Sequence, residues 1–297
     1  MINKYFRCPY CRRELNSHEG GVFCPSCVIL YWYDGVKKNW HFYNPQALHW
    51  CQCVEQVTDY FIEHKRITQI DVDSLPPNSD LIGHPYEALL FDNQEAVLAQ
   101  RANAYLFNLT FRLLSDLLSD GGFALDVGAS RGWSSFHLAR HFYTVALDIS
   151  NHHHLGLGSV PTNIGKGITK VLADGAVLPF ADNTFSVIFM CSVFHHMTDK
   201  VVALNEWYRV LKPGGRLIAV GERPCTIGEI EGSRQLSEYR NKWEIGYTKE
   251  YLQGYFDSCQ FTNISHIHVG YSLNMGYMDE FVEGCDNGII YAKKEGK

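Results

Sequence analysis

The chain has 297 residues, a length that suits one ordinary domain with an appendage or two modest domains. Its apolar fraction of 46% and its charged fraction of 20% are close to the averages of globular proteins and argue against a disordered chain. The formal net charge of −6 provides no overall attraction to nucleic acid or to an anionic membrane.

No part of the sequence has the composition of a membrane span or of an export signal. A membrane helix needs about 18 consecutive apolar residues, and no stretch approaches that length. Residues 1–8 lack the apolar core of a secretory signal. The chain has 10 cysteines, and four of them form two close pairs, which is a metal-binding pattern in a reducing compartment. We therefore expect a cytoplasmic protein.

The two close pairs are Cys-x-x-Cys motifs, formed by Cys8 with Cys11 and by Cys24 with Cys27. Two such motifs joined by a hairpin let four thiolates converge tetrahedrally on one zinc ion. Redox cysteines are the alternative, but a thioredoxin-like motif occurs once and precedes a helix. The pattern predicts a structural zinc ribbon. Because so small a module lacks its own core, we expect loss of the metal to unfold it and to leave the rest of the chain folded.

The surroundings of the ribbon leave two questions open. His49, Cys51 and Cys53 form either a second metal site or an ordinary alternating strand, and no fourth ligand is evident nearby. The aromatic residues of this region either pack the ribbon onto the rest of the protein, which we expect, or form a platform for substrate. These aromatic residues are Tyr10, Phe23, Tyr31, Trp32, Tyr33, Trp40, Phe42 and Tyr43.

The chain divides into three zones. Residues 1–70 hold the ribbon and an accessory segment that is rich in aromatic residues, cysteine and histidine. Residues 71–85 contain the turn-forming sequences PPNSD and GHP, which read as a linker. Residues 86–297 form the third zone, which opens with apolar residues at helical spacing over 93–118 and a stop at the glycines that follow.

After this first helix, short buried-strand patterns alternate with helical ones. Such alternation predicts an α/β fold with a mostly parallel seven-stranded sheet and helices on both faces. The predicted strands cover residues 124–127, 144–149, 170–173, 186–191, 216–220, 264–269 and 289–292. The predicted helices cover residues 134–141, 201–211 and 247–256.

The first strand of this zone runs into a turn with the sequence LDVGASRG over residues 125–132. Small residues there let the backbone turn sharply against a ligand, while the following helix offers free N–H groups. Asp148 ends the next strand, where a carboxylate can accept both hydroxyls of a ribose. Asp174 follows the third strand. These features predict a nucleotide-type site at one edge of the sheet.

At this point residues 90–294 resemble the class I S-adenosylmethionine-dependent methyltransferases, especially those of the ubiquinone/menaquinone-biosynthesis type. The resemblance rests on several motifs that are specific only together. They are LDVG at 125–128, Asp148, Asp174 with LPF at 178–180, FSVI at 185–188, CSVFHH at 191–196 and RVLKPGGRL at 209–217. It implies a Rossmann-like methyltransferase fold behind the zinc ribbon, with S-adenosylmethionine as cofactor and a structural Zn²⁺.

The resemblance also implies which residues bind the cofactor. Gly128 and its neighbours would contact the methionine part, Asp148 the ribose, and Asp174 with the backbone after it the adenine. Asp126 would contact the cofactor or orient the turn. The family usually has a glycine where Ser130 stands, and the motifs at 178–180 and 212–215 disfavour a NAD enzyme. The candidate cofactor residues are Asp126, Gly128, Ala129, Ser130, Gly132, Asp148, Asp174, Gly175, Ala176 and Cys191.

Candidate catalytic residues follow the fourth strand of the sheet. Methyl transfer needs alignment above all, so a base is optional. His195 and His196 lie where a neutral imidazole could deprotonate an acceptor, or where they could merely shape the pocket. Histidines 152–154 read as solvated rather than as metal ligands. Candidate acceptor contacts in the segment after the fifth strand are Glu222, Arg223, Tyr239, Trp243 and Tyr247.

The acceptor is expected to be a small molecule that is methylated at oxygen, nitrogen or carbon. Residues 191–194 replace the Asn/Asp-Pro-Pro-aromatic motif of enzymes that methylate base amino groups. An rRNA or tRNA base methyltransferase is an alternative, because some carry such a ribbon, but the chain has no basic run. An enzyme that transfers or cyclises the aminocarboxypropyl arm of S-adenosylmethionine is another, and a non-catalytic docking protein is the third.

Overall fold

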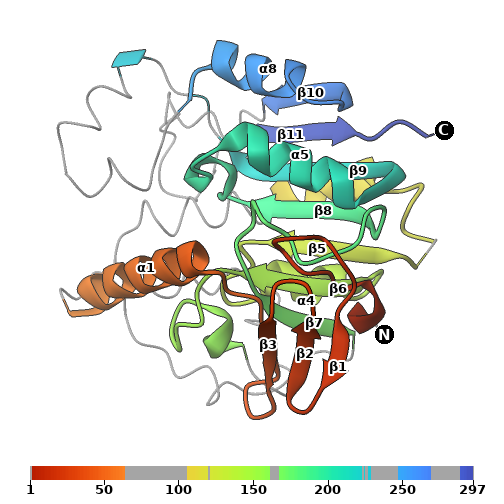
Figure 1. Cartoon of the computed structure of the whole chain (residues 1–297). Helices are drawn as coiled ribbons and strands as arrows, with labels where there is room; N and C mark the ends of the chain where they lie inside the picture. The colour runs from red at the N-terminus through yellow and green to blue at the C-terminus, as the bar shows by residue number, and fades with distance from the viewer. Residues whose placement is uncertain are drawn as a thin grey trace.

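The computed structural model describes residues 2–63, 106–119, 121–160, 167–222, 224, 227–228, 247–268 and 288–296. The expected linker at 71–85 lies outside these residues. Within them, 11 strands form one continuous sheet in the order β1-β2-β3-β4-β7-β6-β5-β8-β9-β11-β10. In Figure 1 this sheet runs from β10 and β11 at the top to the ribbon strands at the bottom. Across these same residues, no helix is both long and apolar enough to cross a membrane.

Seven of the strands form the expected α/β sheet. Five are parallel neighbours in the order β7-β6-β5-β8-β9, and β11 pairs antiparallel with both β9 and β10. This order places β5 centrally with a crossover on either side, as in doubly wound nucleotide-binding folds. The strands are β5 (Phe123–Val127), β6 (Tyr143–Asp148), β7 (Ile168–Leu172), β8 (Phe185–Cys191), β9 (Leu211–Glu222), β10 (Thr262–His268) and β11 (Gly288–Lys293). The predicted fold class is confirmed.

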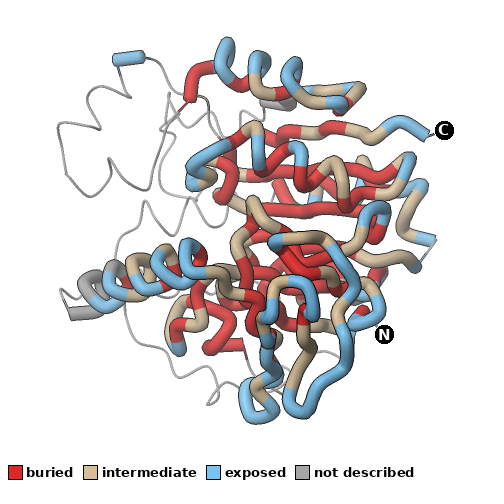
Figure 2. Tube along the Cα trace, in the orientation of Figure 1, coloured by how far each residue is buried: buried red, intermediate tan, exposed pale blue. Residues whose placement is uncertain are grey.

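Alternating side chains of these strands are buried on opposite faces of the sheet. One face carries α5 (Lys200–Val210) and α8 (Lys249–Asp257), whose Trp207 and Phe256 pack with Val127 and Ile188. The other face carries α4 (Trp133–Leu138) and the helical residues 106–113, which pack on Ala124, Val187 and Phe189. Figure 2 shows the resulting band of buried central strands. This two-sided burial is why the strands read as continuous apolar runs.

The ribbon is an extension of the same sheet. It consists of β1 (Asn16–His18), β2 (Gly21–Cys24), β3 (Ile29–Asp34) and β4 (Asn39–His41), and β4 pairs in parallel with β7. Gly21 lets β2 approach β3, because a Cβ there would lie 2.1 Å from the Tyr31 carbonyl oxygen. The buried ribbon residues Phe6, Tyr31 and Phe42 belong to the main core cluster. The ribbon therefore packs onto the α/β part of the protein through a shared core.

Helix α1 (Pro45–Glu63) follows the ribbon, and it corrects the interpretation of His49, Cys51 and Cys53 as an alternating strand. Asn44 caps it by accepting a hydrogen bond from Ala47 N at 2.6 Å, and Pro45 occupies the first helical position. His49 and Cys53, four residues apart, share one face, whereas the Cys51 thiol contacts Tyr43 and Glu55. Because the helix separates these side chains, it does not assemble them into one metal site.

Candidate functional site

The carboxyl ends of β5, β6, β7 and β8 carry the candidate cofactor and catalytic residues. After β5 the backbone turns with φ 68° at Gly128 and φ 78° at Gly132, values that favour glycine. A Cβ on Gly128 would lie 2.4 Å from Val193 Cγ2, so this glycine also lets the turn approach the loop after β8. Gly132 is the N-cap of α4. The turn therefore brings its backbone to the edge where open α/β sheets bind ligands.

Ser130 stands in this turn at a position where the resemblance implied a glycine. Its φ of 46° is in the left-handed region, which glycine adopts more readily than serine. Its hydroxyl donates to the Leu155 carbonyl at 2.8 Å, and its backbone N donates to Asp148 Oδ2 at 2.7 Å. Ala129 N, next to it, donates to the Leu147 carbonyl at 3.0 Å. These bonds tie the turn to the end of β6 and to the loop that follows it.

Asp148 lies between the two loops that would enclose a ribose. Its Oδ1 accepts from Ser150 N at 2.8 Å and its Oδ2 from Ser130 N at 2.7 Å. A carboxylate has about four acceptor positions, so a side chain of this kind can accept ligand hydroxyl groups as well as backbone N–H groups. The arrangement suits an anionic side chain that receives two hydroxyl groups while its orientation is fixed by backbone N–H groups.

Asp126 faces the interior of the protein. The residue is 1% exposed, and its Oδ2 accepts from Ser134 Oγ at 2.7 Å and from Ser135 Oγ. Burial raises the pKa of Asp126 to about 7, although both serine hydrogen bonds act to lower it. We therefore interpret Asp126 as a residue that anchors α4 beneath the glycine turn, which is the second of the two roles considered for it.

Asp174, Gly175 and Ala176 form a tight turn after β7. Asp174 Oδ1 accepts from Ala176 N at 2.8 Å, and burial raises the pKa of this carboxyl. The Gly175 carbonyl accepts from Trp207 Nε1 at 2.9 Å, which fixes the turn to α5. A Cβ on Gly175 would lie 3.0 Å from Val127 Cγ1, so the turn approaches the end of β5 closely. The candidate adenine and methionine segments are thus in contact.

The loop after β8 contains an arrangement that the sequence did not reveal. Glu222, at the end of β9, is 0% exposed and its Oε1 accepts from Val193 N at 2.8 Å and Phe194 N at 2.7 Å. Its Oε2 contacts His195 Nδ1 at 3.2 Å and accepts from Tyr247 Oη at 2.9 Å. This buried carboxylate therefore organises the whole 193–195 segment.

The charge of Glu222 follows from these contacts. Burial acts to raise its pKa, but the positive charge that His195 carries when protonated, and hydrogen bonds with His195, Tyr247 and Phe194, together hold it below the ordinary value. Lys200 Nζ donates to the Met197 carbonyl at 3.0 Å, and burial lowers the pKa of this lysine to about 8. Because a carboxylate only accepts, His195 Nδ1 must donate, which leaves Nε2 of the neutral ring as the basic atom.

The remaining candidates lie at different places. Cys191 ends β8 and is half-buried, while His196 is exposed and its ring centroid is 4.1 Å from that of His195. His152 is buried and contacts Asp59 Oδ1 at 3.0 Å, so it is not the solvated residue expected of that run. Glu222 and Tyr247 face inward rather than forming an open acceptor surface. Arg223, Tyr239 and Trp243 lie outside the described residues.

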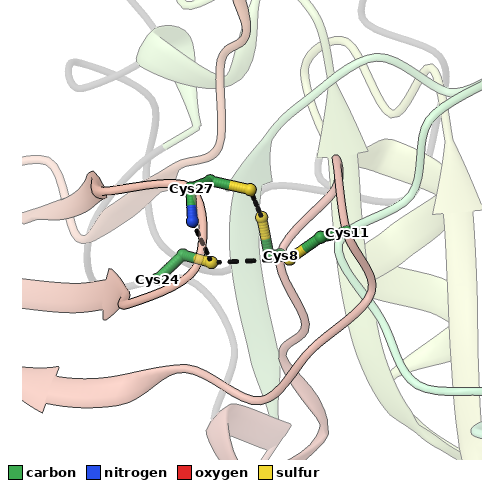
Figure 3. A group of neighbouring side chains, drawn as sticks. All are labelled: Cys8, Cys11, Cys24 and Cys27. Atoms are coloured by element: carbon green, nitrogen blue, oxygen red, sulfur yellow. Dashed lines mark hydrogen bonds between the residues drawn. The ribbon is translucent and has the colours of Figure 1, made fainter.

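The four ribbon cysteines converge as their spacing predicted. Figure 3 shows Cys8, Cys11, Cys24 and Cys27 pointing toward one another, and their Sγ atoms all lie within 4.8 Å of each other. Zinc–thiolate bonds of about 2.3 Å in a tetrahedron would place the sulfur atoms about 3.8 Å apart. The Cys8–Cys27 and Cys11–Cys24 separations are 3.8 and 3.5 Å. Among the described residues, this is the one group of three or more such side chains with the spacing of a metal site.

Comparisons with known proteins agree with this reading of the sheet edge. Residues 125–219 match the family model described as a methyltransferase domain. That range begins within β5 and ends within β9, so it includes the glycine turn, Asp148, Asp174 and His195.

Several relatives each match a part of the chain. Arginine-hydroxylase NDUFAF5, mitochondrial, of Rattus norvegicus is 31% identical over 123 residues, covering 41% of this chain and 35% of that protein. Demethylmenaquinone methyltransferase of Corynebacterium urealyticum is 37% identical over 101 residues, covering 34% and 41%. Ubiquinone/menaquinone biosynthesis C-methyltransferase UbiE of Klebsiella pneumoniae subsp. pneumoniae is 48% identical over 60 residues, covering 20% and 24%.

The chain thus spans less than half of the length of each of these relatives. Together with the order of the sheet and the glycine turn after β5, these matches identify residues 125–219 as a methyltransferase domain, of the kind found in S-adenosylmethionine-dependent methyltransferases.

Proposed function

We propose that this protein transfers the methyl group of S-adenosylmethionine to a small-molecule acceptor. The cofactor would lie across the carboxyl ends of β5, β6 and β7. Backbone groups at Gly128, Ala129, Ser130 and Gly132 would contact its methionine part. Asp148 would take the ribose hydroxyls, and the turn at 174–176 the adenine. Cys191 would close the site from β8.

The observation that carries the mechanism is the contact between His195 and the buried Glu222 at 3.2 Å. When bound, S-adenosylmethionine supplies an electrophilic methyl group whose bond electrons remain on sulfur as the acceptor forms the new bond. His195 Nε2 would take the proton that the acceptor loses. Glu222 would hold the ring in the required tautomer and stabilise the imidazolium that forms. The 26% exposure of the His195 side chain allows an acceptor to reach it.

A base at this position suits an acceptor that becomes a strong nucleophile only after losing a proton. Hydroxyl groups and acidic C–H groups are of this kind, whereas a neutral amine attacks without prior deprotonation. Two of the relatives are a demethylmenaquinone methyltransferase and a ubiquinone/menaquinone biosynthesis C-methyltransferase. We therefore favour oxygen or carbon over nitrogen as the methylated atom. The net charge of −6 continues to disfavour a nucleic-acid acceptor.

We further propose that the four ribbon cysteines hold one structural zinc ion. The donor set supports this, because four thiolates at tetrahedral spacing complete the coordination of the metal. Such a site has no open position for substrate, so the zinc would stabilise the ribbon and take no part in methyl transfer.

Product identification distinguishes the proposed reaction from the alternative use of the cofactor. Purified protein incubated with S-adenosylmethionine and candidate phenol or activated-methylene acceptors should release S-adenosylhomocysteine, detected by mass spectrometry. Release of methylthioadenosine would instead show transfer or cyclisation of the aminocarboxypropyl arm. The matched control is Gly128→Ala, which places a Cβ against Val193 and should remove either product.

A second prediction concerns Asp148. Asp148→Ala should weaken binding of S-adenosylmethionine at least tenfold, because it removes two charge-assisted hydrogen bonds of about 1.5–3 kcal/mol each. Calorimetric titration measures the change. Asp148→Asn keeps one acceptor oxygen and should lose less. Unchanged affinity in Asp148→Ala would show that the ribose does not bind at this carboxylate.

A further inference from the structure

The loop after β6 is bound by residues of the ribbon and of α1. Residues 149–158 of this loop contact β4, α1 and the residues between them. The loop carries Ser150, whose backbone N donates to Asp148, and Leu155, whose carbonyl accepts from Ser130. Any movement of this loop would therefore move the hydrogen-bond partners of the proposed ribose carboxylate.

Tyr43 makes the first of these outside contacts. Its hydroxyl donates to the Ile149 carbonyl at 2.8 Å, one residue after Asp148. Its ring packs against a cluster that contains Ala129 of the glycine turn and Leu157 of the loop. Burial raises the pKa of Tyr43, so the hydroxyl remains a neutral donor. Tyr43 thus binds the residue after Asp148 and packs against the cluster to which Ala129 of the glycine turn belongs.

Asn151 forms two hydrogen bonds, one with α1 and one with β4. Its backbone N donates to Glu55 Oε1 of α1 at 3.3 Å, and its side-chain Oδ1 accepts from Asn39 Nδ2 of β4 at 2.7 Å. Asn39 is fully buried, so this side-chain bond is shielded from water. The Asp59–His152 pair adds a third contact, but Asp59 is 61% exposed and solvent weakens it.

The loop is too compact to absorb a displacement internally. A Cβ on Gly156 would lie 2.5 Å from His152 N, and a Cβ on Gly158 would lie 2.1 Å from the Asn151 carbonyl oxygen. The loop therefore folds closely onto its own backbone. A displacement of residues 149–151 would therefore also move Ser150 N, which donates to Asp148.

We propose that Tyr43, Asn39 and Glu55 are positioning residues for the ribose-binding carboxylate, so that the ribbon and α1 form a working part of the cofactor site. This inference rests on the proposed function, because it assumes that Asp148 binds the ribose. None of the three residues needs to touch the cofactor. They act by fixing the loop from which Asp148 receives its hydrogen bonds.

The test compares two ligands on variants of the full chain. Calorimetric dissociation constants are measured for S-adenosylhomocysteine and for its 2′-deoxy analogue. Tyr43→Phe removes only the hydroxyl, and Glu55→Ala removes the acceptor of Asn151 N. Each should raise the dissociation constant for S-adenosylhomocysteine about three- to tenfold, the scale of one hydrogen bond. For the 2′-deoxy analogue the dissociation constant should rise less than about twofold. This analogue lacks the 2′-hydroxyl, so its hydrogen bonding to Asp148 is already reduced.

Controls separate positioning from general damage. Glu55→Gln keeps Oε1 and should restore binding, and Gln56→Ala changes an exposed residue of the same helix and should leave it unchanged. Zinc content should equal that of wild type in all variants. Equal losses for both ligands, or no loss in Tyr43→Phe and Glu55→Ala, would overturn the inference. If the wild-type protein bound neither ligand, the proposed function itself would fail.

Discussion

Replacing His195 with alanine should lower turnover by roughly a hundredfold or more while leaving the binding of S-adenosylmethionine intact. This is the usual scale of positioned acid–base catalysis, and the reason is that Nε2 would no longer take the proton of the acceptor. Steady-state kinetics with calorimetric binding of the cofactor measures both quantities. The matched control is His196→Ala, since His196 is exposed and His195 is the one that contacts Glu222.

Glu222→Gln tests whether the dyad acts as a unit. The amide oxygen can still accept from Val193 N and Phe194 N, so the loop should keep its fold. The rate of the wild-type enzyme should fall as acid protonates His195. In Glu222→Gln the acidic limb of the pH–rate profile should move to lower pH, because the imidazolium loses its anionic partner. A flat profile, with only few-fold losses in both variants, would leave alignment alone as the source of catalysis.

Glu222 should also make the stability of the protein depend on pH. Its pKa is held below the ordinary value in the folded state, so folding favours the anion. The corresponding stability is fully present above the unfolded pKa of about 4.3 and is lost as pH falls through the folded value. The fully buried position of this carboxylate makes it a sensitive point of acid denaturation.

The central sheet could be predicted because its signals are local. Residues 124–127 and 186–191 are short apolar runs between turns, and β5 and β8 lie at those positions. Helix α1 also has a local signal in the sequence, since Asn44 and Pro45 form a typical helix N-terminus. Pairing of β4 with β7 joins residues 39–41 to residues 170–172, and no local pattern marks a contact between such distant segments.

The residues of the candidate site also divide into those that the sequence indicates and those that only the structure reveals. The glycine turn and Asp148 could be identified because a ligand-binding turn imposes small residues and an acid at fixed places. The role of Glu222 could not, because it depends on contacts with residues 193–195 that lie 27–29 positions earlier in the chain. The sequence placed Glu222 near the acceptor, whereas the structure buries it beneath His195. The inward orientation of Asp126 could not be predicted either, since its serine partners in α4 decide which way its carboxylate faces.

Cys24→Ser should abolish the binding of zinc and destabilise the whole chain. Structural zinc contributes about 10–16 kcal/mol to folding in small peptides, and loss of only about 3 kcal/mol would lower Tm by about 6–12 °C. The ribbon alone was expected to unfold. The structure favours a joint loss of stability instead, because Cys8, Cys24 and Phe42 share a core cluster with Phe180 and Phe185. Elemental analysis and calorimetric melting measure the two effects.

A shared core also predicts that zinc loss reaches the cofactor site. Arg12 is next to Cys11, a proposed zinc ligand. It donates to the carbonyl of Leu178, just after the turn at 174–176, at 2.8 Å, and it pairs with Glu206 at 2.7 Å. Cys24→Ser should therefore weaken S-adenosylhomocysteine binding as well as lower Tm. Cys53→Ser, which changes a thiol of α1 outside the cluster, should do neither. An early transition confined to the ribbon, with wild-type binding of the ligand, would show instead that the two parts fold independently despite their continuous sheet.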